Sequence, residues 1–123
     1  MNGGRVLWLI DGVQIAENNL TQKGVAPLLP LDINLNDQLF RYGVRITNTL
    51  VQDAQCAYIP INIAKPGEPA VFEPIPWFYT PLLLPSPINP VTKNLMQVKA
   101  NFASVLDFTN NENLVEKEIL LIT

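Results

Sequence analysis

The residues that enzymes most often use for proton transfer and nucleophilic attack are nearly missing from this chain of 123 residues. It has no histidine, which excludes Ser-His and Cys-His nucleophilic pairs and the usual imidazole ligands of zinc. Its two serines, Ser86 and Ser104, lie outside any Gly-x-Ser-x-Gly motif, and no glycine-rich phosphate-binding loop is present. We therefore expect no catalytic residue, no metal ligand and no cofactor, and we expect that the protein is not an enzyme.

The acidic residues are the remaining candidates for chemistry. Eleven acids could bring two carboxylates together, as glycosidases require, but their spacing places no pair across a cleft, so exposed solubilising acids are the favoured interpretation. Asp32, Asn34 and Asn36 alternate like the start of a calcium loop. The sixth position is Asp37 where such a loop needs glycine, and the twelfth is Gly43 where it needs a bidentate glutamate. The polar face of a strand explains the same spacing without a metal.

Two further residue patterns have simple structural explanations. Cys56 lies between Gln55 and Ala57 in an expected strand, with no positive charge beside it to lower its pKa, so it is read as a small buried side chain. Pro87 and Pro90 have the spacing of a polyproline ligand for an SH3-type domain but lack the usual flanking arginine. An ordinary extended loop is the favoured interpretation.

The most unusual segment of the chain runs from residue 74 to residue 92. These nineteen residues contain no charged side chain and six prolines. Proline fixes φ and removes a backbone donor, so we expect neither a helix nor an inner strand here. The prolines also exclude a membrane-spanning helix. We predict an extended proline-rich arm, residues 71–92, that lies against an apolar surface.

Large apolar residues in this arm follow one another without the alternation of an ordinary strand. Adjacent residues of a strand point to opposite faces, so one core can receive only every second one of them. Aromatic side chains that cannot reach the core are typical anchors at interfaces between subunits. We therefore predict that seven residues of the arm form an interface with a partner: Trp77, Phe78, Tyr79, Leu82, Leu83, Leu84 and Ile88.

Composition indicates a surface that neighbouring molecules cover. Charged residues make up 15% of the chain against roughly 25% in ordinary soluble domains, and thirteen Asn, six Gln and eleven Pro replace them. The eight basic residues are scattered and form no patch, which disfavours nucleic-acid binding. The single cysteine excludes an internal disulfide, and residues 6–10 are too short an apolar run for a signal peptide. We expect no membrane partner.

Alternation of apolar and polar residues predicts a single β domain over residues 1–123. We expect strands at 6–10 and 13–15, joined by an Asp11-Gly12 hairpin turn, followed by strands at 31–35, 40–50, 56–63, 96–108 and 117–122. Residues 114–122 also fit a short helix. Gly43 predicts a bulge or a bend, and Pro60 predicts that its strand lies at a sheet edge. The expected fold is an all-β, antiparallel β-sandwich or barrel-like domain with the long extended arm.

These properties favour a non-enzymatic assembly protein. The sequence-based hypothesis is a viral or phage particle component, such as a capsid cement or decoration protein, a minor capsid protein or a tail or fibre protein. It would be located in the virion and assembled in the host cytoplasm, with partners among copies of itself or a major capsid or tail protein. The alternative hypothesis is a ligand-binding β-sandwich, such as a carbohydrate-binding module that stacks sugars on Trp8, Trp77 or Tyr79.

Overall fold

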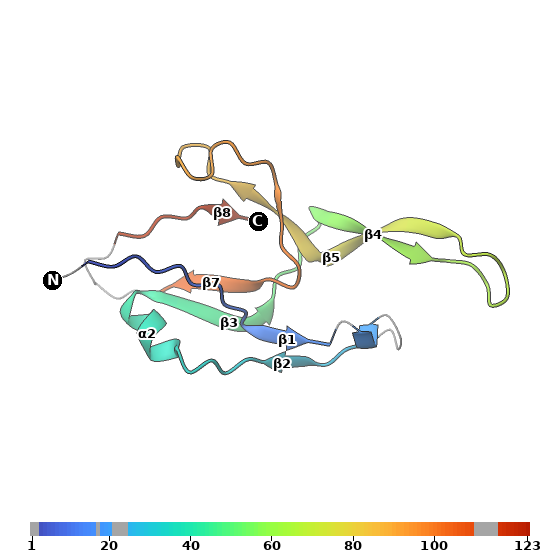
Figure 1. The fold of residues 1–123 in the computed structure, drawn as a ribbon, viewed down its shortest axis with the longest axis horizontal. Helices are drawn as coiled ribbons and strands as arrows, with labels where there is room; N and C mark the ends of the chain where they lie inside the picture. Colours follow the sequence, from blue (N-terminus) through green and yellow to red (C-terminus); the bar gives the residue numbers. More distant parts are fainter. Residues whose placement is uncertain (1–2, 17, 21–24, 110–115) are drawn as a thin grey trace.

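The computed structural model describes residues 3–16, 18–20, 25–109 and 116–123. Most of its regular structure is strand, and helix in the described part is limited to α2 and one turn over residues 18–20. The elements follow the chain in this order: β1 Val13–Ile15, β2 Leu28–Pro30, α2 Asn36–Arg41, β3 Val44–Leu50, β4 Cys56–Asn62, β5 Phe72–Pro85, β6 Val98–Lys99, β7 Ser104–Phe108 and β8 Leu121–Ile122 (Figure 1).

The strands form three antiparallel groups. β1 pairs with β2, β3 pairs with β7, and β5 joins β4, β6 and β8 in one larger sheet. None of these sheets closes into a barrel. The expected all-β class is therefore confirmed, and the barrel-like alternative is not observed.

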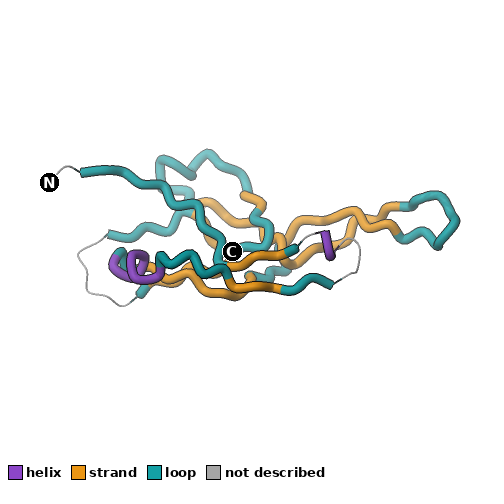
Figure 2. The backbone as a smooth tube through the Cα atoms, turned by 60° about the horizontal axis from the view of Figure 1, so that its bottom comes forward, coloured by secondary structure: helices purple, strands orange, loops and turns teal. Residues whose placement is uncertain are grey.

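β5 is the longest strand and has two different halves. Residues 72–76, the outer half, pair with β4 alone in a hairpin that projects from the rest of the molecule (Figures 1 and 2). Residues 77–85, the inner half, pair with the start of β4, with β6 and, at their far end, with β8. The expectation that prolines exclude this segment from an inner strand is therefore wrong.

The parity of the pairing explains how the outer half of β5 accommodates its prolines. The Ile63 amide donates to the Val71 carbonyl at 2.8 Å, which marks a hydrogen-bonded pair. Such pairs alternate with non-hydrogen-bonded ones, so Pro74, Pro76 and the Pro60 that faces Pro74 fall at non-hydrogen-bonded positions. At those positions the missing amide would point to the free edge, and the ladder loses no bond.

The inner half of β5 is held from both sides by backbone hydrogen bonds. The Phe78 carbonyl accepts from the Asp53 amide at 3.1 Å, and the Leu82 amide donates to the Gln55 carbonyl at 2.9 Å. On the opposite side, the carbonyls of Tyr79 and Pro81 accept from the amides of residues 102 and 100 at 2.9 and 3.1 Å. We call residues 53–56, 77–82 and 98–102 the junction. Its centre contains Thr80, Pro81 and Cys56, all of which are buried.

Residues 6–10 and the Asp11-Gly12 pair differ from the expected hairpin. Residues 6–10 form no strand, and Val13–Ile15 pairs with Leu28–Pro30 instead. Gly12 does not have a positive φ, so it does not form the expected hairpin turn. A Cβ on Gly12 would lie 2.7 Å from the Ser104 hydroxyl and 2.8 Å from the Thr47 carbonyl oxygen. Glycine is therefore required because β3 and β7 approach the backbone closely.

Two other expected strands are interrupted. Residues 31–35 are irregular, and residues 36–41 form α2, which ends where Gly43 adopts a φ of +77°. The Asn34 amide donates to the Asp32 carboxylate in a short turn, so these polar residues do not line a strand. The expected strand at 96–108 is divided into β6 and β7 by a turn in which Phe102 has a φ of +50°. The bend at Gly43 is confirmed.

The hydrophobic core of this fold is small for its length. Among the described residues, the large buried apolar ones are Val13, Leu39, Cys56 and Pro81, whereas many large apolar side chains are exposed. The accessible surface is 10,026 Å². A compact monomer of this mass exposes about 6,600 Å². The fold therefore leaves about 3,400 Å² more surface in water than a compact domain does.

Candidate functional site

The seven predicted interface residues do not lie on one face of the molecule. Trp77 and Tyr79 are half-buried and point into a groove, whereas Phe78 between them is 49% exposed. This is the alternation expected of consecutive residues in a strand. The first part of the predicted set therefore divides into an inward pair and one outward aromatic side chain.

Trp77 and Tyr79 form one wall of a groove that we call the aromatic groove. Their ring centroids are 5.5 Å apart at an interplanar angle of 59°, and Tyr79 lies 6.4 Å from the ring of Phe102. The cavity has a volume of about 390 Å³ and is lined by Ile15, Leu20, Ala26, Leu28, Asn48, Thr49, Leu50, Gln52, Trp77, Tyr79 and Phe102. Two rings tilted in this way present no single flat platform to a sugar.

The leucines and the isoleucine of the predicted set lie at the end of β5 and in the loop that follows it. Leu82 and Leu83 are half-buried and pair with β6, while Leu84 is 41% exposed opposite Ile122 of β8. Ile88 is 84% exposed in the loop that follows. That loop is closed by the Thr92 hydroxyl, which donates to the Ser86 carbonyl at 2.9 Å. The Pro87-x-x-Pro90 pattern is thus part of an ordinary loop.

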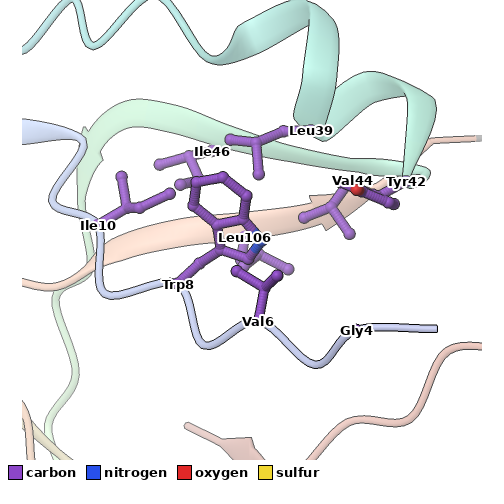
Figure 3. Close-up of a pocket in the computed structure, with 9 residues that line it drawn as sticks. All are labelled: Gly4, Val6, Trp8, Ile10, Leu39, Tyr42, Val44, Ile46 and Leu106. Carbon is purple, nitrogen blue, oxygen red and sulfur yellow. The ribbon is translucent and has the colours of Figure 1, made fainter. Parts of the chain in front are cut away.

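A second groove, which we call the Trp8 groove, was not predicted from the sequence. It has a volume of about 470 Å³, and its lining residues come from the N-terminal segment, α2, β3 and β7: Gly4, Val6, Trp8, Ile10, Leu39, Tyr42, Val44, Ile46 and Leu106. Figure 3 shows the side chains of Val6, Trp8 and Ile10 pointing toward Leu39, Ile46 and Leu106. The alternation of Val6, Trp8 and Ile10 was the available signal, but it was interpreted as strand pairing.

Charged groups in the described residues give neither groove a catalytic character. Arg45 and Asp107 form an exposed ion pair of 3.2 Å across β3 and β7. The Thr123 hydroxyl and the Gln55 amide donate to the Asp53 carboxylate and together lower its pKa, with the Thr123 bond the larger cause. In the described part of the chain, no three His, Cys, Asp or Glu residues lie together where they could hold a metal ion. The arrangement suits binding of apolar groups.

Cys56 has the environment that its sequence context indicates. Its thiol is free, and the residue is 5% exposed at the start of β4, opposite Pro81. The prediction of a small buried side chain is confirmed.

Comparison with known proteins identifies a family over the whole sequence. Residues 1–123 match the model of the ABC transport auxiliary family, which is described as an ABC-type uncharacterized transport system. No curated protein and no solved structure matches the chain. Within the described residues, no helix has the length and apolar character needed to cross a bilayer.

This match contradicts the hypothesis of a viral or phage particle component. The capsid, decoration, tail and fibre roles and the location in a virion are therefore wrong, because the family is one of a transport system. The physical reason for the error is that low charge and exposed apolar residues indicate a covered surface without indicating what covers it. The inference of a particle component rested on analogy, and the family match replaces it. This chain belongs to the ABC transport auxiliary family, an ABC-type uncharacterized transport system family.

Proposed function

We propose that this chain is a non-catalytic, protein-binding component of an ABC-type transport system. The observation that carries the proposal is the match of the family model to residues 1–123. The fold supports a binding role because it contains two apolar grooves and leaves many large apolar side chains exposed. The absence of histidine and of an acidic or metal-binding cluster among the described residues supports a non-catalytic role.

The extent of exposed surface supports a protein as the partner. An interface of standard size removes about 800 Å² of surface from each partner. The surface in excess of a compact monomer is about 3,400 Å², several times that area. Many large apolar side chains are exposed, and contiguous exposed apolar surface is typical of protein interaction sites.

We infer different roles for the inward and outward residues of the predicted interface. Phe78, Leu84 and Ile88 would contact the partner directly, because their side chains reach solvent. Trp77, Tyr79, Leu82 and Leu83 would support them, since they pack against this chain's own strands and fix the backbone of the inner half. In this interpretation the segment packs against its own chain with its inward residues and against a partner with its outward residues. A sheet or helix of the partner would supply the second layer of a sandwich-like arrangement.

The energetic anchor of this interface would be Phe78. Complete burial of a phenylalanine side chain contributes about 1.5–3 kcal/mol. The backbone at Phe78 is already fixed by the bond between its carbonyl and the Asp53 amide, so little conformational entropy is lost when the ring is covered. An aromatic side chain held in this way is typical of an interface hot spot.

The test uses two matched substitutions in a complex with the other subunits of an ABC-type transport system. The chain is co-expressed with the membrane-embedded and ATP-hydrolysing subunits, and affinity is measured on the purified proteins. We expect Phe78→Ala to weaken binding by about 2 kcal/mol, roughly 30-fold. Phe72→Ala in the outer half removes a ring that is 63% exposed, against 49% for Phe78, so it serves as the control and should change affinity less than about threefold.

Two results would overturn the proposal. If the chain binds neither subunit at micromolar concentration, it is not a component that acts by binding them. If Phe72→Ala and Phe78→Ala weaken binding equally, the inner half of β5 is not the contact surface.

A further inference from the structure

Residues 6–10 have the composition of a strand but pair with none of the strands in the described part of the chain. They read Val-Leu-Trp-Leu-Ile, an uncharged run of residues that favour extended backbone. Within the described part of the chain, none of their amides or carbonyls forms a backbone hydrogen bond. Among the residues that the structure describes, these five consecutive peptide groups therefore have no backbone partner, and they lie beside a strongly apolar surface.

Both faces of this segment are apolar, but only one face is used. Val6, Trp8 and Ile10 point into the Trp8 groove, toward α2 and the β3–β7 pair (Figure 3). Leu7 and Leu9 point the other way and are 82% and 87% exposed. A strand with unpaired peptide groups and exposed leucines is a template for pairing with another strand.

The charges that flank the run favour one kind of partner. Arg5 precedes it and Asp11 follows it, and both are exposed without an ion-pair partner among the described residues. If two copies of residues 5–11 pair antiparallel about Trp8, Arg5 of each copy lies opposite Asp11 of the other. Parallel pairing in register would place Arg5 beside Arg5 and Asp11 beside Asp11, and like charges in direct opposition are destabilising.

We propose that residues 5–11 form an antiparallel strand pair with the same residues of a second copy of this chain. The two Trp8 residues face each other at the centre, and Val6 of one copy faces Ile10 of the other. On the exposed face, Leu7 of one copy lies beside Leu9 of its partner. Opposed side chains of antiparallel strands have Cβ atoms about 4.5–5.5 Å apart, so the four leucines contact one another.

The new strand pair leaves the Trp8 groove intact. Side chains of one strand face stay on that face when a neighbour pairs along the backbone edge. Val6, Trp8 and Ile10 can therefore keep their positions against Leu39 and Ile46 while the peptide groups bond to the second copy. This interaction is separate from the proposed contact of Phe78 with transport subunits.

The experiment measures self-association of the purified chain by sedimentation velocity over a range of concentrations. We expect a monomer–dimer equilibrium. Arg5→Asp replaces two attractive cross-strand pairs with two repulsive ones and should raise the dimer dissociation constant roughly 10- to 100-fold. Adding Asp11→Arg to that variant restores both opposite-charge pairs, so the double variant should return to within about threefold of the native value. Lys93→Asp makes the same change in net charge on an exposed loop and should have less than a threefold effect.

Hydrogen exchange of the same samples locates the contact. Protection of amides in residues 6–10 should rise with protein concentration in the native chain and not in Arg5→Asp. A monomer at all concentrations, failure of the double variant to restore association, or an equal effect of Lys93→Asp would overturn the proposal. Because the assay contains no transport subunit, failure here leaves the proposed binding function unaffected.

Discussion

The two halves of β5 have similar sequences and different structural roles. The outer half contains Pro74 and Pro76, and the inner half contains Pro81 and Pro85, so both halves are proline-rich and uncharged except for Glu73. The outer half is exposed along its whole length, whereas the centre of the inner half is buried. The number of neighbouring segments explains the difference. β4 alone contacts the outer half, while the inner half is bonded on both sides.

This comparison shows that proline does not decide whether a strand is inner or outer. What matters is the direction in which the missing amide would point and whether another segment needs it. In the inner half the Pro81 carbonyl still accepts from the Ala100 amide, so one ladder bond is kept at a proline. The junction is thus expected to hold most of the stability of the sheet, and the outer hairpin little of it.

The largest expected difference between the halves comes from a matched pair of tyrosine substitutions. Tyr79→Ala removes a ring that contacts Trp77 and Phe102 in the aromatic groove, and it should lower the free energy of unfolding by about 2–3 kcal/mol. Tyr58→Ala in the outer hairpin removes a ring that is 65% exposed, and it should cost less than about 0.5 kcal/mol. Urea denaturation measures both. Equal losses would show that the two halves contribute alike.

The next effect tests the parity of the outer half. Ile75→Pro places a proline at a hydrogen-bonded position opposite Ile59 and should cost about 1–3 kcal/mol of hairpin stability. Pro74→Ala restores an amide that points to the free edge, and its effect should stay within about 0.5 kcal/mol. Hydrogen exchange of the hairpin amides follows the change locally. If Pro74→Ala were the more disruptive change, the assigned parity would be reversed.

A smaller effect is expected from one buried hydroxyl in the junction. The Thr80 side chain is 2% exposed, and its hydroxyl donates to the Asn101 amide oxygen at 3.1 Å. Thr80→Val keeps the shape and removes this bond, which should cost about 1 kcal/mol. Thr49→Val removes a solvent-exposed hydrogen bond with the Thr47 hydroxyl of β3; it is the exposed control and should change stability by less than about 0.5 kcal/mol. Thermal unfolding followed by circular dichroism distinguishes the two variants.

The smallest effect depends on pH and concerns Asp53, whose amide bonds to the inner half at Phe78. Hydrogen bonds from Thr123 and Gln55 lower the pKa of its carboxyl in the folded chain below the value in the unfolded chain. The resulting stability is present above the unfolded pKa of about 3.9 and is lost as pH falls through the lower folded pKa. Asp53→Asn should therefore reduce the fall in melting temperature between pH 5 and pH 2. An unchanged pH profile would contradict the pKa direction.

The parts of the fold predicted from sequence are those in which local pattern and tertiary pairing agree. Ile59 and Ile61 alternate with Pro60 and Asn62, and the predicted strand is present there as β4. Its one neighbour among the described strands is β5, so this pairing agrees with the local pattern. Gly43 predicts a bulge or a bend because a glycine interrupts the strand pattern there, and the structure shows a bend with a φ of +77°. Residues 6–10 have an equally strong strand pattern and form no strand, because pairing needs a neighbour that the local sequence cannot supply.

The candidate site was predicted in composition but not in arrangement. Trp77 and Tyr79 of β5 line one groove, yet Ile15 and Leu50 complete that groove from distant strands that no local pattern connects to Trp77. The helix at α2 was missed because a six-residue helix shows less than two turns of its period, which alternation easily imitates. Whether the outward residues of the arm bind a partner remains a prediction for the Phe78→Ala experiment.

Cys56 gives the junction a native chemical reporter. Its sulfur lies at the start of β4, where the outer hairpin meets the inner half, and it is the chain's one thiol. A reagent such as an alkylating iodoacetamide can reach it only when that region opens. The rate at which the unmodified protein is labelled therefore measures how often the inner half of β5 separates from its neighbours. A bound partner that holds Phe78 in place should slow that labelling without touching the cysteine.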